Sequence, residues 1–304
     1  MLYIVGLGLG GDERGVTVRG LDAVRRCARV YMEARTALLT LGVDPSSSLV
    51  KLVRSRPLAP VARACRREAV REGGHGRRPG DGGRGVEERG DRILREAAGA
   101  DVAFLVVGHP FGSYDEPFSS RTSHTDLVVR AKKTGIQVKV IDSASVVNGV
   151  GVCGLQLHRY GEAITIPFFT ETWKRDNFYQ KIVNNRWNGH HTLCLLDVYV
   201  KEPVSEYLMS RGNKVYEPPR FMTVNTAMSQ LLEVLEMRGE PDPAYDEDSL
   251  CIGVARLGSD DEKIVAGPMG RLVDVDFGPP PHCLVIVGET NQVEEDMLEF
   301  YMIN

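Results

Sequence analysis

The chain has 304 residues, of which 42% are hydrophobic and 26% are charged, the composition of an ordinary globular protein with one large or two medium domains. Its net charge of −4 argues against a protein whose whole surface neutralises nucleic-acid phosphates, so nucleic acid is an unfavoured partner. The sequence shows neither a secretory signal pattern nor a run of 18 apolar residues, so we expect a cytoplasmic protein that does not contact a membrane.

The first predicted elements are a strand over residues 2–7, a glycine-rich turn, GLGLGG, and a helix over residues 18–32. Gly6, Gly8 and Gly11 match the G-x-G-x-x-G spacing of dinucleotide-binding loops, and Glu33 lies about where such proteins place an acidic residue. A chain with 32 glycines also produces this spacing by chance, so both interpretations stay open at this point.

Short apolar, β-branched segments predict buried strands at residues 2–7, 101–108, 137–142, 163–168, 191–200, 249–258 and 282–288. Helical patterns at residues 18–32, 123–135 and 227–239 separate several of them. This alternation predicts an α/β architecture with a mainly parallel sheet. A glycine-punctuated stretch near residues 148–161 divides the chain, so we expect an N-terminal α/β domain over 1–160 and a C-terminal one over 161–304.

Residues 54–84 do not fit this pattern, because they hold nine arginines, three acidic residues and three prolines but no aromatic residue. We interpret the segment as a disordered insertion or an artefact of the gene model, since it offers little apolar surface to bury. The alternative is a basic arm that contacts RNA or ribosome-bound partners. The lack of aromatic residues for base stacking makes that alternative less favoured.

Six cysteines lie far apart without a C-x-x-C pair, and several sit within apolar runs. They predict buried free thiols in a reducing compartment rather than a zinc site. The histidines show no metal-ligand spacing either, so we predict no bound metal.

Candidate ligand contacts follow the predicted strands. The run AFLVVGHPFGS places Gly108 and Gly112 just after a buried strand, where glycine lets the backbone approach a ligand. Ser145 begins a predicted helix, which it could cap, or it could contact a ligand. Leu196 and Leu257 stand near later strand ends, and His282 precedes the last strand. No nucleophile motif is present, so the residues alone indicate a two-domain α/β enzyme that binds a small ligand.

The same segments resemble the diphthine synthases, also called diphthine methyl ester synthases, which belong to the tetrapyrrole methylase class of S-adenosylmethionine-dependent methyltransferases. The matching stretches include MLYIVGLGLG, DVAFLVVGHPFG, SASVVNGVGVCGLQL, NGHHTLCLLDV, YEPPRFMTVNTA and CIGVARLGSDDEKIVAG. They cover most of the chain except residues 43–85 and 113–121.

The resemblance implies two α/β domains with S-adenosylmethionine in the cleft between them, so the glycine loop is not a dinucleotide cradle. It also implies methylation of the aminocarboxypropyl-histidine of elongation factor 2, the protein substrate, to diphthine methyl ester in diphthamide biosynthesis, by a homodimer. The catalytic residue stays unassigned. The implied cofactor contacts are Leu9, His109, Gly112, Ser145, Val146, Leu196, Leu257 and His282.

His109 stands where the family has an acidic residue, so we expect it to attract the positively charged cofactor less strongly. An additional stretch, SYDEPFSS, follows the same loop. These differences leave two alternatives: a catalytically impaired homologue that binds the elongation factor or the ribosome, and a methylase of tetrapyrroles.

Overall fold

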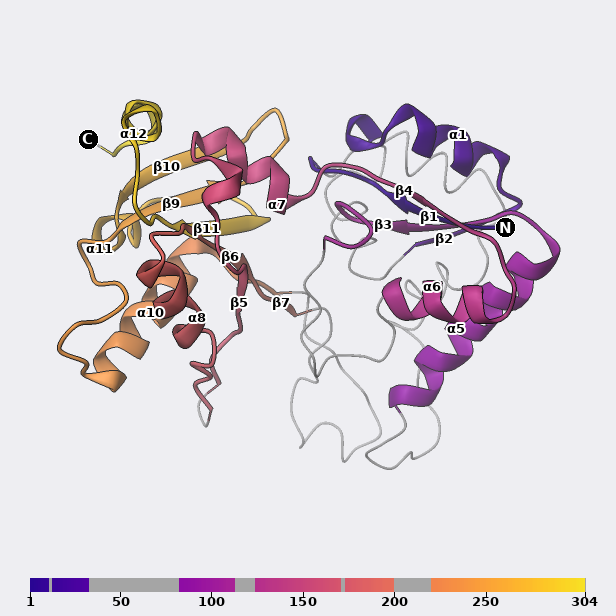
Figure 1. The fold of residues 1–304 in the computed structure, drawn as a ribbon, viewed down its shortest axis with the longest axis horizontal. Coiled ribbons are helices and arrows are strands. Elements are labelled where there is room, and N and C mark those ends of the chain that lie inside the picture. The colour runs from indigo at the N-terminus through magenta and orange to yellow at the C-terminus, as the bar shows by residue number, and fades with distance from the viewer. Residues whose placement is uncertain (11–12, 33–81, 113–123, 171–172, 200–219, 304) are drawn as a thin grey trace. The chain divides into compact units, whose positions relative to one another are not determined.

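The computed structural model describes residues 1–10, 13–32, 82–112, 124–170, 173–199 and 220–303. These residues form two compact units, each with its own sheet and core (Figure 1). The first unit contains the described residues up to Ser145, and the second contains Val146–Tyr199 and the chain from Arg220 onward. Of the predicted insertion, residues 54–81 lie outside the described residues, and residues 82–84 belong to the first turn of a helix.

The first unit alternates strands and helices in chain order. Its elements are β1 (Leu2–Gly6), η1 (Glu13–Gly15), α1 (Val18–Arg26), β2 (Arg29–Met32), α5 (Gly82–Gly99), β3 (Val102–Val106), α6 (His124–Lys133) and β4 (Val138–Ile141). The strands form one sheet in the order β2-β3-β1-β4, and every neighbouring pair is parallel.

Helices cover both faces of this sheet, with α1 on one face and α5 and α6 on the other (Figure 1). Successive residues of β1 alternate between the two cores: Ile4 packs with the α5 and α6 side, and Val5 packs with the α1 side. Two apolar faces explain why these strands read as continuous apolar runs in the sequence.

The second unit begins with short helices and continues with strands and two longer helices. Its elements are α7 (Val146–Gly149), η2 (Val150–Cys153), η3 (Leu157–Arg159), β5 (Ile164–Ile166), α8 (Tyr179–Trp187), β6 (Thr192–Leu196), β7 (Val198–Tyr199), β8 (Arg220–Phe221), α10 (Val224–Arg238), β9 (Leu250–Ala255), β10 (Lys263–Pro268), α11 (Met269–Leu272), β11 (His282–Ile286), α12 (Gln292–Leu298) and η4 (Glu299–Tyr301).

The sheet of the second unit has the order β10-β9-β11-β6-β5, and only the β5–β6 pair is parallel. The expectation of mainly parallel strands is therefore correct for the first unit and wrong for the second. The sequence conceals this difference because both faces of the second sheet are buried as well. Helices α8 and α10 pack on one face, and η2 and α12 pack on the other.

The predicted helix over residues 18–32 is too long. Helix α1 ends at Arg26, Cys27 has an extended backbone, and Arg29–Met32 forms strand β2 beside β3. The periodic apolar residues fit a helix, but Val30 and Tyr31 also suit a buried strand, and pairing with β3 decides the outcome. The prediction of buried free thiols is confirmed for the five described cysteines, and Cys65 lies outside the described residues.

Candidate functional site

Three loops of the first unit come together at one edge of its sheet, because parallel strands end on the same side. They follow β1, β3 and β4. Gly8 and Gly108 join the first two loops through a pair of backbone hydrogen bonds, 3.3 Å from Gly8 N to Gly108 O and 3.1 Å from Gly108 N to Gly8 O. Ser143 Oγ ties the third loop to the first by donating to the Gly15 carbonyl at 2.9 Å.

The glycines of the N-terminal turn permit this close packing. A Cβ on Gly6 would lie 2.5 Å from the Gly108 carbonyl oxygen, and one on Gly8 would lie 2.1 Å from the Gly15 carbonyl oxygen. Gly8 also has a φ of +74°, which glycine adopts readily. Gly6 and Gly8 thus allow the strand-end loops to pack together, while Gly11 and Glu33 of the dinucleotide pattern lie outside the described residues.

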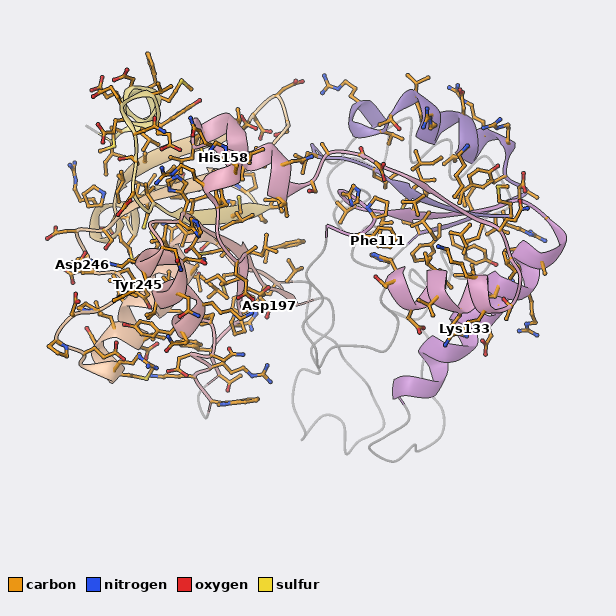
Figure 2. All side chains as sticks on the ribbon, in the orientation of Figure 1. Phe111, Lys133, His158, Asp197, Tyr245 and Asp246 are labelled. Atoms are coloured by element: carbon orange, nitrogen blue, oxygen red, sulfur yellow. The ribbon has the colours of Figure 1, made fainter. Side chains whose placement is uncertain are left out.

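Four of the predicted site residues belong to this edge: Leu9, His109, Gly112 and Ser145. Gly112 donates its N–H to the His109 carbonyl at 3.0 Å. A Cβ on Gly112 would meet Ser145 Cβ at 3.1 Å and His109 Cβ at 3.2 Å, so these residues are in contact. Ser145 is buried and immediately precedes α7. Phe111, labelled in Figure 2, lies in the same loop and is 46% exposed.

His109 does not stand alone at this edge. Its Nδ1 accepts the backbone N–H of Phe111 at 3.1 Å, which places the ring proton on Nε2. That nitrogen lies 3.4 Å from Oδ1 of Asp142, the first residue after β4. The edge therefore carries a carboxylate, although position 109 does not supply it.

Predicted residues of the second unit gather at one end of its sheet. His282 pairs with Ala255 in the ladder between β11 and β9, and Leu257 follows two residues after that pair. Cys283 pairs with Leu195, so Leu196 stands next to His282 in the neighbouring strand. Leu257 packs with the core beneath η2 and α12, as does Val146 at the start of α7, whereas Leu196 packs with the core beneath α8 and α10.

The imidazole of His282 is fixed by three backbone groups. Its Nδ1 accepts the N–H of Val224 at 3.3 Å, and its Nε2 lies 3.1 Å from the carbonyl oxygens of Gly278 and Pro279. Burial lowers the pKa of His282 and outweighs the opposing effect of those carbonyls. The neutral ring therefore joins the N-terminus of α10 to the loop before β11.

Arg256 connects the same loop to the turn that carries Leu257. Its Nη1 donates to the carbonyls of Phe277 and Pro279, each at 2.7 Å, and its Nε lies 2.6 Å from Oδ2 of Asp261. The side chain is only 13% exposed, and its backbone has a φ of +52°, which is unusual for a residue other than glycine. The guanidinium of Arg256 thus joins the loop before His282 to the turn that carries Leu257.

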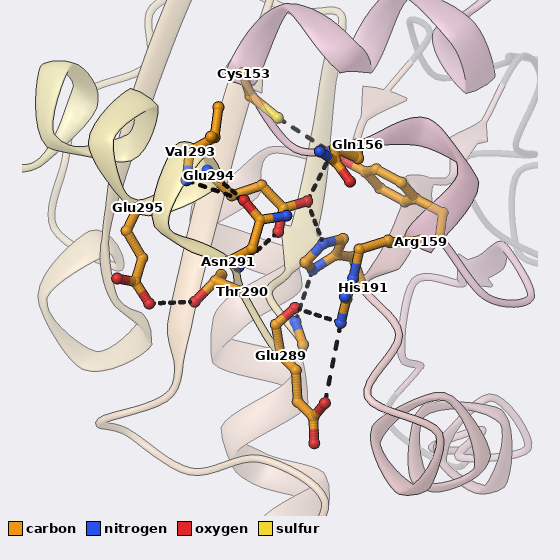
Figure 3. A network of polar contacts seen from close by, with 12 residues as sticks. Cys153, Gln156, Arg159, His191, Glu289, Thr290, Asn291, Val293, Glu294 and Glu295 are labelled. Atoms are coloured by element: carbon orange, nitrogen blue, oxygen red, sulfur yellow. Dashed lines mark hydrogen bonds and ion pairs between the residues drawn. The ribbon is translucent and has the colours of Figure 1, made fainter.

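A separate buried network lies in the second unit, on the side of η2 and α12 (Figure 3). Glu294 closes the first turn of α12 by accepting the N–H of Asn291, and Asn291 in turn caps the helix. The same carboxylate accepts the N–H of Gln156 at 2.9 Å and faces His191. These contacts join the segment after η2, the residue directly before β6 and helix α12, so we assign the network a structural role.

The cofactor implied by the resemblance is compatible with the residues present. S-adenosylmethionine carries an ammonium, a sulfonium, a carboxylate and an adenine. In the first unit, Asp142 offers a carboxylate to a cation and Ser145 offers a hydroxyl, while in the second unit Leu196 and Leu257 offer apolar side chains. Within the described ranges there is no group of three histidine, cysteine or acidic residues that could hold a metal ion. None of the described helices has the length and apolar character needed to cross a membrane.

Sequence reasoning did not single out Asp142, Arg256 or the pair His191–Glu294. The signal for Asp142 was an acidic residue directly after a predicted strand, in VIDSAS. Arg256 stands in a turn rich in glycine and acidic residues, ARLGSDDE, where an arginine is ordinarily read as a surface residue. His191 and Glu294 are 103 residues apart, and no local pattern connects them.

Comparison with known proteins gives consistent results. The family model for tetrapyrrole (corrin/porphyrin) methylases matches residues 1–273. The chain is 54% identical to a protein of Arabidopsis thaliana named "Probable diphthine methyl ester synthase", over 99% of this chain and 98% of the relative. It is 46% identical to the diphthine methyl ester synthase of Homo sapiens, over 100% of this chain and 95% of the relative. A crystal structure from Entamoeba histolytica, provisionally identified as a diphthine synthase, has a TM-score of 0.75 at 37% identity and covers 100% of this chain and 99% of that one. The chain therefore belongs to the tetrapyrrole methylase family and, within it, to the diphthine methyl ester synthases.

Proposed function

We propose that this methyltransferase of diphthamide biosynthesis transfers methyl groups from S-adenosylmethionine to the aminocarboxypropyl-histidine of elongation factor 2 and forms diphthine methyl ester. The observation that carries the proposal is similarity over the whole chain to diphthine methyl ester synthases, at 54% and 46% identity. The arrangement of small and polar residues at the strand ends supports it, because such loops bind ligands in α/β proteins.

For the cofactor we propose contacts to Leu9, His109, Gly112 and Ser145 in the first unit. In the second unit we propose contacts to Val146, Leu196, Leu257 and His282. We propose that backbone groups make most of these contacts, because five of the eight residues are glycine, valine or leucine and the imidazole of His282 is already bonded to Val224, Gly278 and Pro279. The bound cofactor supplies an activated methyl group on sulfur.

Catalysis by these residues rests on positioning. An activated methyl donor needs an acceptor nitrogen or oxygen in line with the sulfur and no competing water, and orientation alone can contribute much of the rate. Loops whose backbone is fixed by hydrogen bonds, such as those at Gly8–Gly108 and at Arg256, are suited to such positioning. We assign no catalytic base.

We also propose that the protein acts in the cytoplasm as a homodimer, with elongation factor 2 as its protein partner. The resemblance to the family supports this proposal. Sedimentation of the purified chain at micromolar concentration gives the mass of the assembly. A single species with the mass of one chain, 33.5 kDa, contradicts the homodimer.

A transfer assay with three acceptors tests the function. The purified protein is incubated with methyl-labelled S-adenosylmethionine and elongation factor 2 bearing aminocarboxypropyl-histidine, with the unmodified factor, or with a porphyrin precursor. We expect label only on the modified factor, because only that acceptor offers an amine and a carboxylate on the histidine. Equal labelling of unmodified factor, or labelling of the porphyrin alone, contradicts the assignment. Binding of the factor without transfer indicates an impaired homologue.

A further inference from the structure

We propose that Asp142 supplies the negative charge that faces the positively charged part of the methyl donor, and that His109 is the positioning residue that orients its carboxylate. This inference rests on the proposed use of S-adenosylmethionine. It changes the expectation for His109, because the charge missing at position 109 is present at Asp142, directly after β4, on the other side of β1 in the same sheet.

The first step of the argument is the position of Asp142. Strand β4 ends at Ile141, so Asp142 stands at the edge where the loops after β1 and β3 meet. The next residue, Ser143, is bonded to the Gly15 carbonyl, which fixes the backbone beside the carboxylate. The Asp142 side chain is 76% exposed, so a ligand can reach its oxygens.

The second step is the direction of the hydrogen bond. Because Nδ1 of His109 accepts the Phe111 N–H, the ring presents its Nε2 proton to Asp142, at 3.4 Å from Oδ1. The His109 side chain is 32% exposed and lies in the loop after β3, in contact with Gly112. A donor held on one side of a carboxylate limits its rotation and leaves its other oxygen for a ligand.

The third step is the charge. A neutral imidazole and a carboxylate carry one negative charge together, the same as a single acidic residue. An exposed pair of this kind contributes little to folding, because solvent screens it. Folding therefore does not explain why this pair is present. Attraction for a ligand that carries an ammonium and a sulfonium does explain it.

The test is calorimetric binding of S-adenosylmethionine to the full chain and to single variants. Asp142→Asn keeps the shape and removes the charge, so we expect affinity to fall at least about tenfold. His109→Gln keeps a donor and the carboxylate, so we expect a loss of less than about fivefold. Asp22→Asn on α1, an exposed acidic residue paired with Arg25, serves as the matched control and should leave affinity unchanged.

A second ligand separates charge from folding. 5′-Methylthioadenosine shares the adenosine part but has neither the ammonium nor the sulfonium, so its affinity should be the same in wild type and Asp142→Asn. The double exchange His109→Asp/Asp142→His should bind S-adenosylmethionine within about threefold of wild type, since the carboxylate and its imidazole partner are both retained.

Two results overturn the inference. One is equal affinity of wild type and Asp142→Asn for S-adenosylmethionine, and the other is an equal loss for both ligands, which indicates structural damage. Failure of the wild type to bind S-adenosylmethionine at all contradicts the proposed function instead, so the two failures are distinguishable.

Discussion

His191 Nε2 lies 3.3 Å from Oε1 of Glu294, and both side chains are fully buried (Figure 3). Nδ1 of His191 accepts the N–H of Gly288 at 3.0 Å, so the proton is on Nε2 and points to the carboxylate. Burial raises the pKa of Glu294, but hydrogen bonds from the backbone of Gln156 and Asn291 and from His191 outweigh it, and the net pKa is lowered. The carboxylate is therefore ionised, and it accepts hydrogen bonds from three donors.

Removing the charge of Glu294 should lower the folding stability of the second unit. In Glu294→Gln, an amide NH₂ replaces one acceptor oxygen and faces an N–H donor, so we expect a loss of about 2–4 kcal/mol in the free energy of unfolding. The nearby Glu295→Gln is the control, since the Glu295 side chain is exposed and accepts a hydrogen bond from Thr290 (Figure 3); it should change stability by less than about 0.5 kcal/mol. Denaturant unfolding of the wild type and both variants measures the difference. Equal stability of Glu294→Gln and the wild type would show that the network contributes nothing.

Stability should decrease as the pH falls from 7 to 5. Burial lowers the pKa of His191 below its usual 6.5 and outweighs the opposing effect of Glu294, so the folded protein keeps this ring neutral where the unfolded chain binds a proton. The contribution is complete above about pH 6.5 and is lost progressively below it, at up to about 1.4 kcal/mol per pH unit. Glu294, with its pKa below 4.5, stays ionised throughout this window.

His191→Gln isolates this effect. His282, whose pKa burial also lowers, is retained in the variant, so the difference in slope between wild type and variant belongs to His191. Thermal midpoints of both proteins at pH 7, 6 and 5 supply the measurement. We expect a flatter profile for the variant, and parallel profiles would contradict a neutral buried His191.

Gly8→Ala should be more harmful than Gly135→Ala. The two glycines have nearly the same φ, +74° and +76°, but a Cβ on Gly8 would lie 2.1 Å from the Gly15 oxygen, whereas a Cβ on Gly135 would meet no atom of the described residues within 4 Å. Gly135→Ala should cost about 1–2 kcal/mol through backbone strain alone. Gly8→Ala should cost at least about 2 kcal/mol more and weaken cofactor binding. Chemical denaturation and calorimetry measure both, and similar values for the two variants would refute the close packing of the strand-end loops.

Arg256→Gln should lower stability by about 2 kcal/mol, because the carbonyls of Phe277 and Pro279 lose a charged donor. The bond to Asp261 adds little, since that carboxylate is 67% exposed. Arg19→Gln, an exposed arginine of α1, is the matched control and should have little effect. Comparison of their thermal midpoints decides the matter: a drop no larger than that of the control would mean that Arg256 does not hold the loop before β11.

The sequence predicts the elements of this fold better than the relationships between them. All seven segments interpreted as strands contain one, and the helical patterns over residues 123–135 and 227–239 end at left-handed Gly135 and Gly239, just after α6 and α10. Strands β2, β8 and β10 were missed, because pairing with β3, β7 and β9 decides them. The antiparallel second sheet was missed for a similar reason: apolar runs buried on two faces do not reveal direction.

At the site, local motifs led to the strand-end loops, since glycine and serine after an apolar run carry a local signal. Pairings between distant residues carried none. His109 and Asp142 meet only because β3 and β4 flank β1 in one parallel sheet. Arg256 reaches Phe277 only because β9 and β11 are neighbours.

Site-resolved mass spectrometry of elongation factor 2 tests the central claim most directly. After reaction of the factor bearing aminocarboxypropyl-histidine with S-adenosylmethionine and this protein, the peptide containing that histidine is isolated and its methyl groups are counted before and after mild alkali. The account predicts methyl groups on the amine and one further, alkali-labile group on the carboxylate, all on this one residue. An unmethylated histidine peptide, or methyl groups elsewhere in the factor, would contradict it.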